Sequence, residues 1–364
     1  MFGKIGLTLK LYKMELTTEE QKQYNRHLIL DKIGAEGQLK LKQAKVLVIG
    51  AGGLGCPVLQ YLTAAGVGTI GIIDDDEVDQ SNLQRQILYT INDVGFSKAE
   101  TAAKRLSKLN PFVKFNIYKE KLTRDNAISM FNSYDVIVDG SDNFSTRYLT
   151  NDASVLTNKP LIYGAIFKFE GQVSVFNYKG SATYRCLYPT PPKPDESPNC
   201  SQIGVLGVLP GIIGSLQANE TIKIICEIGD VLANKLLMYD TLSMRQMILG
   251  YEKNTTSQIN QLEEDYDFFC GIKAVENEIT LKELQKNKED YNLLDVRENS
   301  EREEYHIGGQ HIPLKEISDR FNELDATKSI VVYCKSGIRS KKAIEILKKQ
   351  GYSNSLINLK HGCF

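Results

Sequence analysis

The sequence has almost no net charge and no apolar run long enough to cross a membrane. Its 44 lysines and arginines face 45 aspartates and glutamates, and the formal net charge of -1 provides no field that attracts nucleic acid or an anionic membrane. The most apolar stretch, Ile203 to Leu216, is interrupted by Pro210 and is shorter than the roughly 20 residues of a membrane span. The first residues have too short an apolar core for a signal peptide. These absences exclude nucleic-acid and membrane partners and favour a cytoplasmic protein.

Clustered cysteines are also missing. The seven cysteines are scattered along 364 residues, so in a cytosolic protein each is a packing thiol, a ligand or a nucleophile. Cys56 and Cys226 lie in apolar helical segments and are expected to pack. The length favours two domains, and the polar, aperiodic stretch Glu252 to Asp265 is typical of a linker. We therefore expect domains at 1–270 and 274–364, with a linker at about 252–273.

The most informative stretch is a glycine-rich turn. The apolar run Val46–Ile49 is long enough for one buried strand, and a helical pattern begins near Val58. A strand, a glycine turn and a helix N-terminus form a cradle for phosphates, because backbone amides and the helix dipole favour negative charge. This pattern does not separate NAD, FAD and ATP. The glycines are Gly50, Gly52, Gly53 and Gly55.

Charged residues downstream indicate the ligand and the reaction. Asp74 follows a second β-branched run, about 20 residues past the turn, where an acid usually holds a ribose; alternatively, it only starts a loop. Hydride transfer builds no phosphate charge, whereas attack on an α-phosphate does, and Arg85 and Lys98 are placed to neutralise it. At the end of a third strand, Asp142 is the candidate ligand for Mg²⁺ and Asp139 is the alternative.

The segments GAGGLG, IIDDD, SNLQRQ, Lys98 and DGSDN, in this order, resemble the ubiquitin-activating-type adenylyltransferases, and within them the MoeB/ThiF/HesA branch that activates small sulfur-carrier proteins. The resemblance spans approximately residues 15–270. It implies an α/β, Rossmann-like ATP-binding domain with a mixed sheet, and ATP and Mg²⁺ as cofactors. It also implies a homodimer in which Arg26, within YNR, reaches the ATP of the other subunit. The other ATP-site residues that it implies are Asp74 for the ribose, Asn82 for the nucleotide, Arg85 and Lys98 for the phosphates, and Asp142 for Mg²⁺.

A proline-rich stretch before Cys200 predicts a loop. From its position alone, Cys200 is either a transient nucleophile or an incidental thiol without a role. The resemblance favours the nucleophile, since the family keeps a cysteine here that takes an acyl thioester or a disulfide.

The family also carries two CxxC pairs that bind a structural Zn²⁺. Only Cys186 and Cys270 remain of them here, and Thr183 and Asp267 occupy the other two positions. Threonine is a poor ligand, and closed zinc sites need four good ones, so we expect no zinc. A weak site made of two cysteines and one aspartate is the alternative.

The C-terminal part carries a second reactive centre. Cys334 follows an apolar strand and precedes a helix expected at Lys341–Lys349, so loop amides and nearby cations favour a thiolate or persulfide. Cys334 and Arg339 enclose four residues, a smaller ring than in cysteine phosphatases and suited to one sulfane sulfur. With LLDVRE and YHIGGQHIPL, this part resembles a small α/β rhodanese domain, in which Asp295 and Arg297 orient the loop. The last helix of a rhodanese is expected to be missing.

These features predict ATP-dependent adenylation of the C-terminal glycine of a ubiquitin-like sulfur carrier that ends in Gly-Gly. A donor such as a cysteine desulfurase loads Cys334, its persulfide attacks the acyl-adenylate, and Cys200 releases the thiocarboxylate. In one alternative, the second domain is only a docking module. In another, the first domain is an NAD-binding oxidoreductase, against which Arg85, Lys98 and Asp142 argue. The pathway of the carrier, whether molybdopterin, thiamin or another thiolation, stays open.

Overall fold

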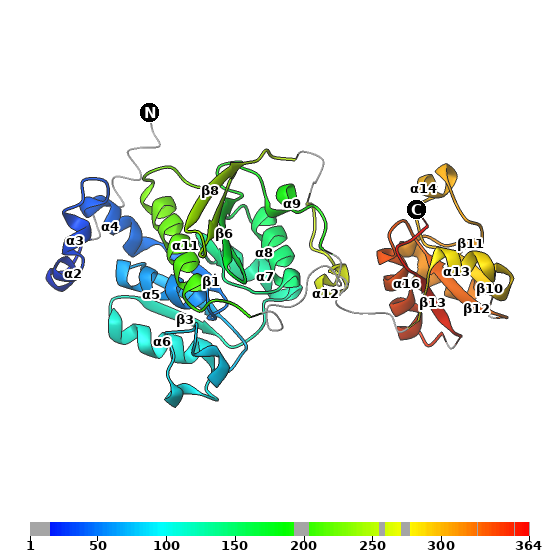
Figure 1. The fold of residues 1–364 in the computed structure, drawn as a ribbon, viewed down its shortest axis with the longest axis horizontal. Helices are drawn as coiled ribbons and strands as arrows, with labels where there is room; N and C mark the ends of the chain where they lie inside the picture. Colours follow the sequence, from blue (N-terminus) through cyan, green and yellow to red (C-terminus); the bar gives the residue numbers. More distant parts are fainter. Residues whose placement is uncertain are drawn as a thin grey trace. The chain divides into compact units, whose positions relative to one another are not determined.

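The computed structural model describes residues 15–192, 204–254, 259–270, 277–325, 327–352 and 354–363 (Figure 1). The chain divides into two compact units, Met1–Tyr266 (unit 1) and Asp267–Phe364 (unit 2). The division falls inside the segment predicted as a linker, parts of which (255–258 and 271–276) lie outside the described residues. The predicted domain limits at 270 and 274 therefore stay a prediction.

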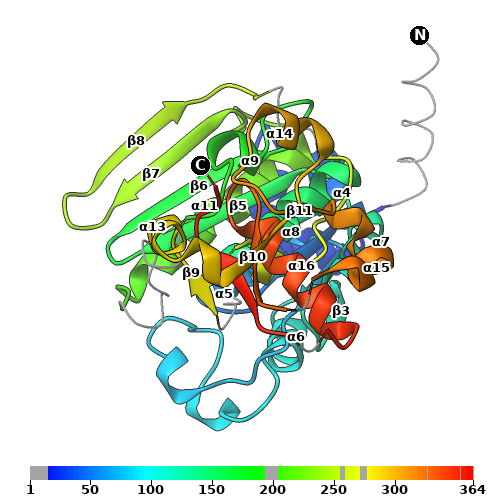
Figure 2. The same ribbon diagram turned by 90° about the vertical axis from the view of Figure 1, so that its right-hand side faces the viewer.

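Unit 1 holds one eight-stranded mixed sheet (Figures 1 and 2). Its strands are β1 (Lys45–Ile49), β2 (Thr69–Ile73), β3 (Lys114–Tyr118), β4 (Val136–Asp139), β5 (Leu161–Phe167), β6 (Glu170–Phe176), β7 (Lys235–Asp240) and β8 (Arg245–Gly250). In the order β3-β2-β1-β4-β5-β6-β7-β8, the first five are parallel and the last three continue antiparallel. The predicted Rossmann-like fold with a mixed sheet is confirmed.

Helices of unit 1 cover both faces of this sheet. Because successive strand residues point to opposite faces, Val48 joins the core below α5 (Gly55–Ala65), whereas Leu47 lies beside Tyr134 on the other face. α11 (Val208–Cys226) packs across α5 and against β5 and β6. The other helical segments are α2 (Thr18–Gln23), α3 (Asn25–Leu28), α4 (Gly34–Gln43), η1 (Gln80–Asn82), η2 (Ile91–Asp93), α6 (Lys98–Leu109), α7 (Arg124–Asn132), α8 (Phe144–Leu156), α9 (Tyr184–Leu187) and, at the boundary, α12 (Tyr266–Phe269).

Two local features set helix ends near the glycine turn: a left-handed glycine ends α5, and a serine hydroxyl caps the start of α6. α5 stops at Gly66, whose left-handed backbone (φ 83°) favours glycine. α6 starts at Lys98 because the Ser97 hydroxyl caps it by accepting from the amide of Glu100. Within the described part of the chain, no helix is both long and apolar enough to cross a bilayer.

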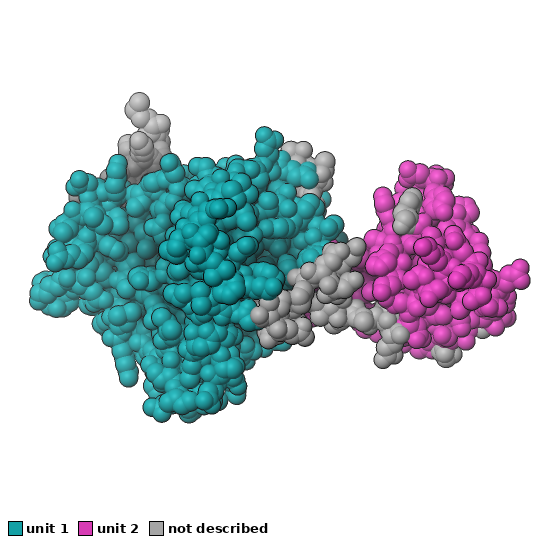
Figure 3. All heavy atoms as spheres, viewed as in Figure 1, with its two compact units in different colours: residues 1–266 teal, residues 267–364 magenta. Residues whose placement is uncertain are grey.

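Unit 2, magenta in Figure 3, holds a parallel five-stranded sheet with a core of its own. Its strands are β9 (Glu278–Ile279), β10 (Tyr291–Asp295), β11 (Gln310–His311), β12 (Ser329–Tyr333) and β13 (Leu356–Leu359), in the order β11-β10-β12-β13-β9. Val332 faces one apolar cluster and Tyr333 the opposite one. The prediction of a second, small α/β domain is confirmed. Its helical segments are α13 (Leu281–Lys286), η3 (Lys288–Asp290), α14 (Asn299–Glu304), η4 (Leu314–Glu316), α15 (Ile317–Arg320), η5 (Phe321–Glu323) and α16 (Ile338–Lys349).

Candidate functional site

Neighbouring atoms pack so closely against the glycine turn that side chains at some of its glycine positions would collide with them. Gly50 has a left-handed backbone (φ 85°), and its amide donates to the carbonyl of Ile73 at 2.9 Å. A Cβ on Gly55 would overlap the carbonyl oxygen of Gly50, and a Cβ on Gly53 would lie 3.3 Å from Pro210 at the start of α11. The turn therefore presents bare backbone amides at the N-terminus of α5, which is the geometry that binds phosphate.

Asp74 lies beside this turn, at the end of β2. Its carboxylate accepts from the amide of Ala51 at 2.7 Å and from the amide of Asp76 at 2.9 Å. Burial raises the pKa of Asp74, and the two amide hydrogen bonds oppose that shift. The side chain is thus fixed against the turn, and the ribose assignment stays a prediction.

Cations approach the turn from the next two segments. The side chain of Lys98 is buried at the start of α6, with its Nζ 2.8 Å from a carboxylate oxygen of Asp76. Arg85 lies with its Cγ 3.6 Å from where a Cβ on Gly53 would stand, and its guanidinium donates to the carbonyl of Ser81. The structure therefore gathers both cations around the cradle.

Two polar side chains of the SNLQRQ segment complete this surface. Asn82 ends η1, and its Oδ1 accepts from the amide of Asp79 at 3.3 Å. Gln86, which the sequence alone did not single out, is buried with its Nε2 about 3.5 Å from where a Cβ on Gly52 would stand. Its Oε1 has no hydrogen-bond partner among the described residues. Its place in the motif, next to Arg85, was the signal that could have found it.

The two candidate magnesium ligands differ in exposure. Asp139 is buried at the end of β4, where it accepts from the amide of Ser141 at 2.9 Å, and burial raises its pKa. Asp142 is exposed, just before the cap of α8. Proteins usually bind Mg²⁺ through one or two carboxylates together with substrate phosphates, so the free-standing Asp142 fits the ion better.

The YNR segment lies at the start of α3. Tyr24 is buried, and its hydroxyl accepts from Asn110 Nδ2 at 2.8 Å, whereas Arg26 is exposed. The segment is therefore anchored by its tyrosine and presents its arginine outward. Cys200 lies outside the described residues.

At two of the positions where the resemblance places zinc ligands, the residues present are hydrogen-bonded, and the absence of zinc stays a prediction. The amide of Thr183 donates to the sulfur of Cys186 at 3.4 Å, and that sulfur faces the carbonyl of Asn254 at 3.9 Å. Cys270 is buried. Nowhere in the described ranges do three His, Cys, Asp or Glu side chains gather as metal ligands would.

A largely buried ion-pair cluster, the Asp152 clasp, consists of Asp152, Arg185, Tyr266 and the partly exposed Glu263. Arg185 donates from two nitrogens to Asp152 at 2.8 and 2.6 Å and lies 3.2 Å from Glu263. The Tyr266 hydroxyl also donates to Asp152, at 2.7 Å. The guanidinium lies over the ring of Tyr148. The clasp therefore ties α8 and α9 to the end of unit 1.

We expect Asp152→Ala to destabilise unit 1 by about 3–5 kcal/mol, because Asp152 is 1% exposed and its loss removes the carboxylate that accepts two hydrogen bonds from Arg185. Urea unfolding of the full chain, followed by the near-ultraviolet signal of the surrounding tyrosines, measures the change. Glu227→Ala is the matched control, since it removes an exposed partner of Lys40 and should cost no more than about 1 kcal/mol. A chelator should leave the midpoint of the unmodified chain unchanged; a fall would contradict this account of the clasp.

In unit 2, Cys334 lies buried between the end of β12 and the start of α16. The amide of Gly337 donates to its sulfur at 3.2 Å, and the Ser340 Oγ lies 3.5 Å from it. Gly337 has a left-handed backbone (φ 84°), which turns this amide back toward the sulfur. Of the loop amides predicted to face Cys334, the one that donates to its sulfur among the described residues is that of Gly337. The helix starts at Ile338, not at Lys341 as predicted.

Arg339, the cation at the other end of this loop, is paired. Both of its terminal nitrogens lie 2.6 Å from the carboxylate of Glu301. Hydrogen bonds from Arg339 lower the pKa of Glu301 to about 2. Because a lowered pKa favours the folded state above the ordinary pKa, the pair contributes stability at neutral pH and loses it as the pH falls toward 2.

Asp295 and Arg297 form a fully buried pair below the loop. Arg297 donates to both carboxylate oxygens, at 2.9 and 2.8 Å, and to the carbonyl of Tyr305 at 2.7 Å. Although burial opposes it, hydrogen bonds from Arg297 lower the pKa of Asp295. The pair fixes the segment that follows β10, and its role in orienting the Cys334 loop stays a prediction.

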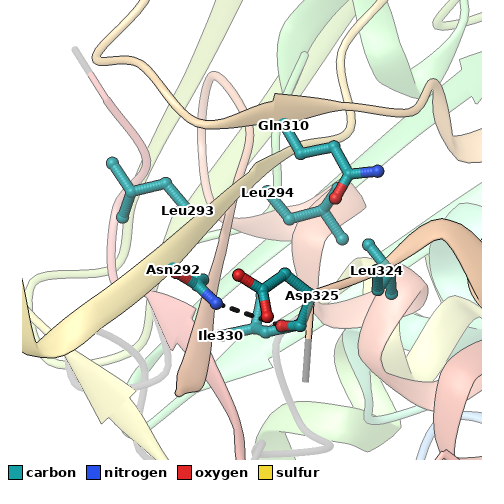
Figure 4. Close-up of a pocket in the computed structure, with 7 residues that line it drawn as sticks. All are labelled: Asn292, Leu293, Leu294, Gln310, Leu324, Asp325 and Ile330. Atoms are coloured by element: carbon teal, nitrogen blue, oxygen red, sulfur yellow. Dashed lines mark hydrogen bonds between the residues drawn. The ribbon is translucent and has the colours of Figure 1, made fainter. Parts of the chain in front are cut away.

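A shallow pocket of about 190 Å³ lies elsewhere in unit 2 (Figure 4). Asn292 bridges it by donating to the carbonyl of Asp325 at 3.0 Å. The pocket reaches Ile330 near the start of β12, whereas Cys334 follows the end of that strand, so it is not the sulfur site. Its lining residues are Asn292, Leu293, Leu294, Gln310, Leu324, Asp325 and Ile330.

Two family models match this chain, one in each unit. The ThiF family model matches residues 24–259, more than half of the chain, and the rhodanese-like domain model matches residues 280–364. The chain belongs to the ThiF family. Among its relatives, the probable adenylyltransferase/sulfurtransferase MoeZ of Mycobacterium tuberculosis is 43% identical over 94% of this chain and 91% of its own. The sulfur carrier protein adenylyltransferase of Thermus thermophilus, also a relative, is 48% identical over 71% of this chain and all of its own length.

Solved structures agree with this family assignment at the level of the fold. The structure of Escherichia coli MccB with MccA-N7isoASN matches 67% of this chain and 75% of its own, with a TM-score of 0.59 and 22% identity. The resemblance that the motifs indicated, a ThiF-type domain followed by a rhodanese domain, is thereby confirmed.

Proposed function

We infer that this protein is an ATP-dependent adenylyltransferase and sulfurtransferase acting on a ubiquitin-like sulfur-carrier protein that ends in Gly-Gly. One observation carries the inference: a bare glycine cradle flanked by cations and a rhodanese-type cysteine loop occur in one chain, as in a relative named for both activities. The name of the Thermus relative supports a sulfur carrier as the substrate.

Adenylation joins the terminal carboxylate of the carrier to the α-phosphate of ATP and releases pyrophosphate. The amides of the glycine turn bind the phosphates, Asp74 holds the ribose and Asn82 contacts the nucleotide. Negative charge grows on the phosphates as pyrophosphate leaves, so Arg85 and Lys98 act by neutralising it. Mg²⁺, held by Asp142, supplies further neutralisation when bound.

Sulfur transfer follows on the adenylate. A donor such as a cysteine desulfurase loads one sulfane sulfur on Cys334, and the terminal sulfur of this persulfide attacks the acyl carbonyl while AMP leaves. The Cys200 thiolate then attacks the Sγ of Cys334, the S–S bond to the acyl sulfur breaks, and the thiocarboxylate departs. A Cys200–Cys334 disulfide remains, which a thiol reductant must reduce before the next cycle.

Three further features belong to this proposal. The protein works as a homodimer, with Arg26 of one protomer at the nucleotide of the other; the exposure of Arg26 beside a buried Tyr24 supports this. No zinc is needed, since the Asp152 clasp joins the segments that the metal would join. The compartment proposed for this activity is the cytoplasm.

Intact-mass analysis of candidate carriers incubated with the full chain and ATP tests the first step. We expect the mass of one AMP to be added to a carrier that ends in Gly-Gly, and none to the same carrier without its last glycine. If no carrier gains AMP, or if the shortened one gains it equally, carrier adenylation is wrong.

A further inference from the structure

Hydrogen bonds connect Cys334 to the rim of unit 2 through buried polar side chains. Ser340 Oγ, 3.5 Å from the Cys334 sulfur, donates to Asn358 Oδ1 at 2.7 Å. Asn358 Nδ2 donates to Glu278 Oε1 at 3.0 Å. Cys334, Ser340 and Asn358 are fully buried, whereas Glu278 is partly exposed and pairs with Lys341. We name Glu278, Asn358 and Ser340 the thiol chain; it joins β9, β13 and α16.

Glu278 sets the direction of each bond in the thiol chain. Burial raises its pKa, but hydrogen bonds from Lys341 and Asn358 outweigh burial and bring the pKa below its ordinary value. Glu278 is therefore ionised at neutral pH and can only accept, so Asn358 must turn its NH₂ group toward Glu278. The amide oxygen then faces Ser340, and since that oxygen also only accepts, Ser340 must give it the single hydroxyl proton.

As a consequence, Ser340 turns a lone pair toward Cys334. It can accept the S–H bond of a thiol, but it can donate to a thiolate only by leaving the buried oxygen of Asn358 without a partner, which is costly. On another side, the amide of Gly337 donates to the same sulfur at 3.2 Å. Cys334 thus lies between a donor suited to the anion and an acceptor suited to the thiol.

We propose that Ser340, oriented by Asn358 and Glu278, is a positioning residue that holds the sulfur-free Cys334 as a thiol. In this state the thiol chain slows, without preventing, the reaction of Cys334 with electrophiles, including the sulfur donor of the proposed loading step. This inference deepens the sulfur-transfer function proposed above and rests on it for its biological meaning. The bond directions themselves follow from the contacts alone.

Replacing Asn358 with leucine, of similar size, tests the proposal. In Asn358→Leu the hydroxyl of Ser340 loses its acceptor on Asn358, and its other polar contact among the described residues is Cys334, so we expect its proton to turn to the sulfur and stabilise the thiolate. We expect iodoacetamide to alkylate Cys334 about tenfold faster, the value of one buried hydrogen bond to a charged group. The rate is measured on the full chain at one neutral pH by mass spectrometry of the peptide that contains Cys334.

A double variant separates this effect from simple loosening of the loop. In Asn358→Leu combined with Ser340→Ala no hydroxyl can donate, so the rate should return to within about twofold of Ser340→Ala alone. A rate that stays high in the double variant, or no increase in Asn358→Leu, overturns the proposal. Asn292→Leu makes the same change on β10, where Asn292 bonds to Asp325, and should leave the rate within about twofold of the unmodified chain.

If Asn358→Leu does not fold, Glu278→Leu replaces it. Without the carboxylate, Asn358 is free to turn its NH₂ group toward Ser340, and the same Ser340-dependent increase is expected. Because alkylation needs neither ATP nor carrier, its outcome is independent of whether adenylation and sulfur transfer occur.

Discussion

Lys98→Ala is expected to reduce the kcat/KM of carrier adenylation by about 10²–10³-fold, the usual loss when one preorganised charge-stabilising group is removed from a site. Lys98 is buried at the start of α6, so its stem is already ordered, and its ammonium faces Asp76 beside the glycine turn. In the reaction it must exchange that partner for a phosphate oxygen. Carrier-dependent exchange of pyrophosphate into ATP measures the effect.

Lys104→Ala provides the matched control for this variant. Lys104 lies on the same helix, but its side chain is exposed, and its loss should leave the exchange rate unchanged. We expect neither variant to have a folding defect, because Asp76, the partner that Lys98 leaves behind, is largely exposed. Urea unfolding of both variants checks this. Exchange by Lys98→Ala at more than half the unmodified rate would remove Lys98 from the phosphate site.

Cys334→Ala is expected to separate the two activities. Thiocarboxylate formation should fall by at least about 10³-fold, as when a covalent nucleophile is removed, while carrier adenylation continues at its normal rate. The reason is that the glycine cradle and Cys334 belong to units with separate cores, so the substitution leaves the nucleotide site intact. Intact-mass analysis of the carrier distinguishes the adenylate from the thiocarboxylate in one measurement.

Cys363→Ala is the control for loss of a thiol in the same unit. Cys363 is also buried, and its amide donates to the carbonyl of Cys334, but a backbone contact survives removal of its sulfur. We therefore expect normal thiocarboxylate formation. If Cys334→Ala still makes thiocarboxylate at the unmodified rate, the persulfide route through Cys334 is refuted.

The parts of the fold that local patterns encode were predictable. The strand, glycine turn and helix around Gly50 follow from a short apolar run and residue spacing, and the structure has them as β1 and α5. The start of α16 was placed three residues late, because the left-handed backbone of Gly337 begins the helix before any apolar period is visible. The position of Cys334 at the end of a strand was predicted correctly.

Interactions between distant segments were not predictable in the same way. Asp152 and Tyr266 meet across 114 positions of sequence, and Glu278 and Asn358 across 80. Each is an ordinary polar residue in its local segment, and only the packing of the sheets brings the pairs together. The clasp and the thiol chain are therefore features of the tertiary structure. Gln86 is intermediate, since it lies within a motif but its burial depends on the turn.

The packing of α11 against the glycine turn has a consequence for synthesis on the ribosome. Pro210 at the start of α11 lies on the turn at Gly53, and Gly214 passes so close to Leu54 that a Cβ there would clash with its carbonyl oxygen, at 2.5 Å. A ribosome adds only about 5–20 residues per second, so the turn emerges roughly 8–30 s before the helix that covers it. A nascent chain that ends before residue 208 therefore carries every predicted phosphate ligand but lacks α11, the helix that packs against the glycine turn. The nucleotide site becomes complete only late in translation.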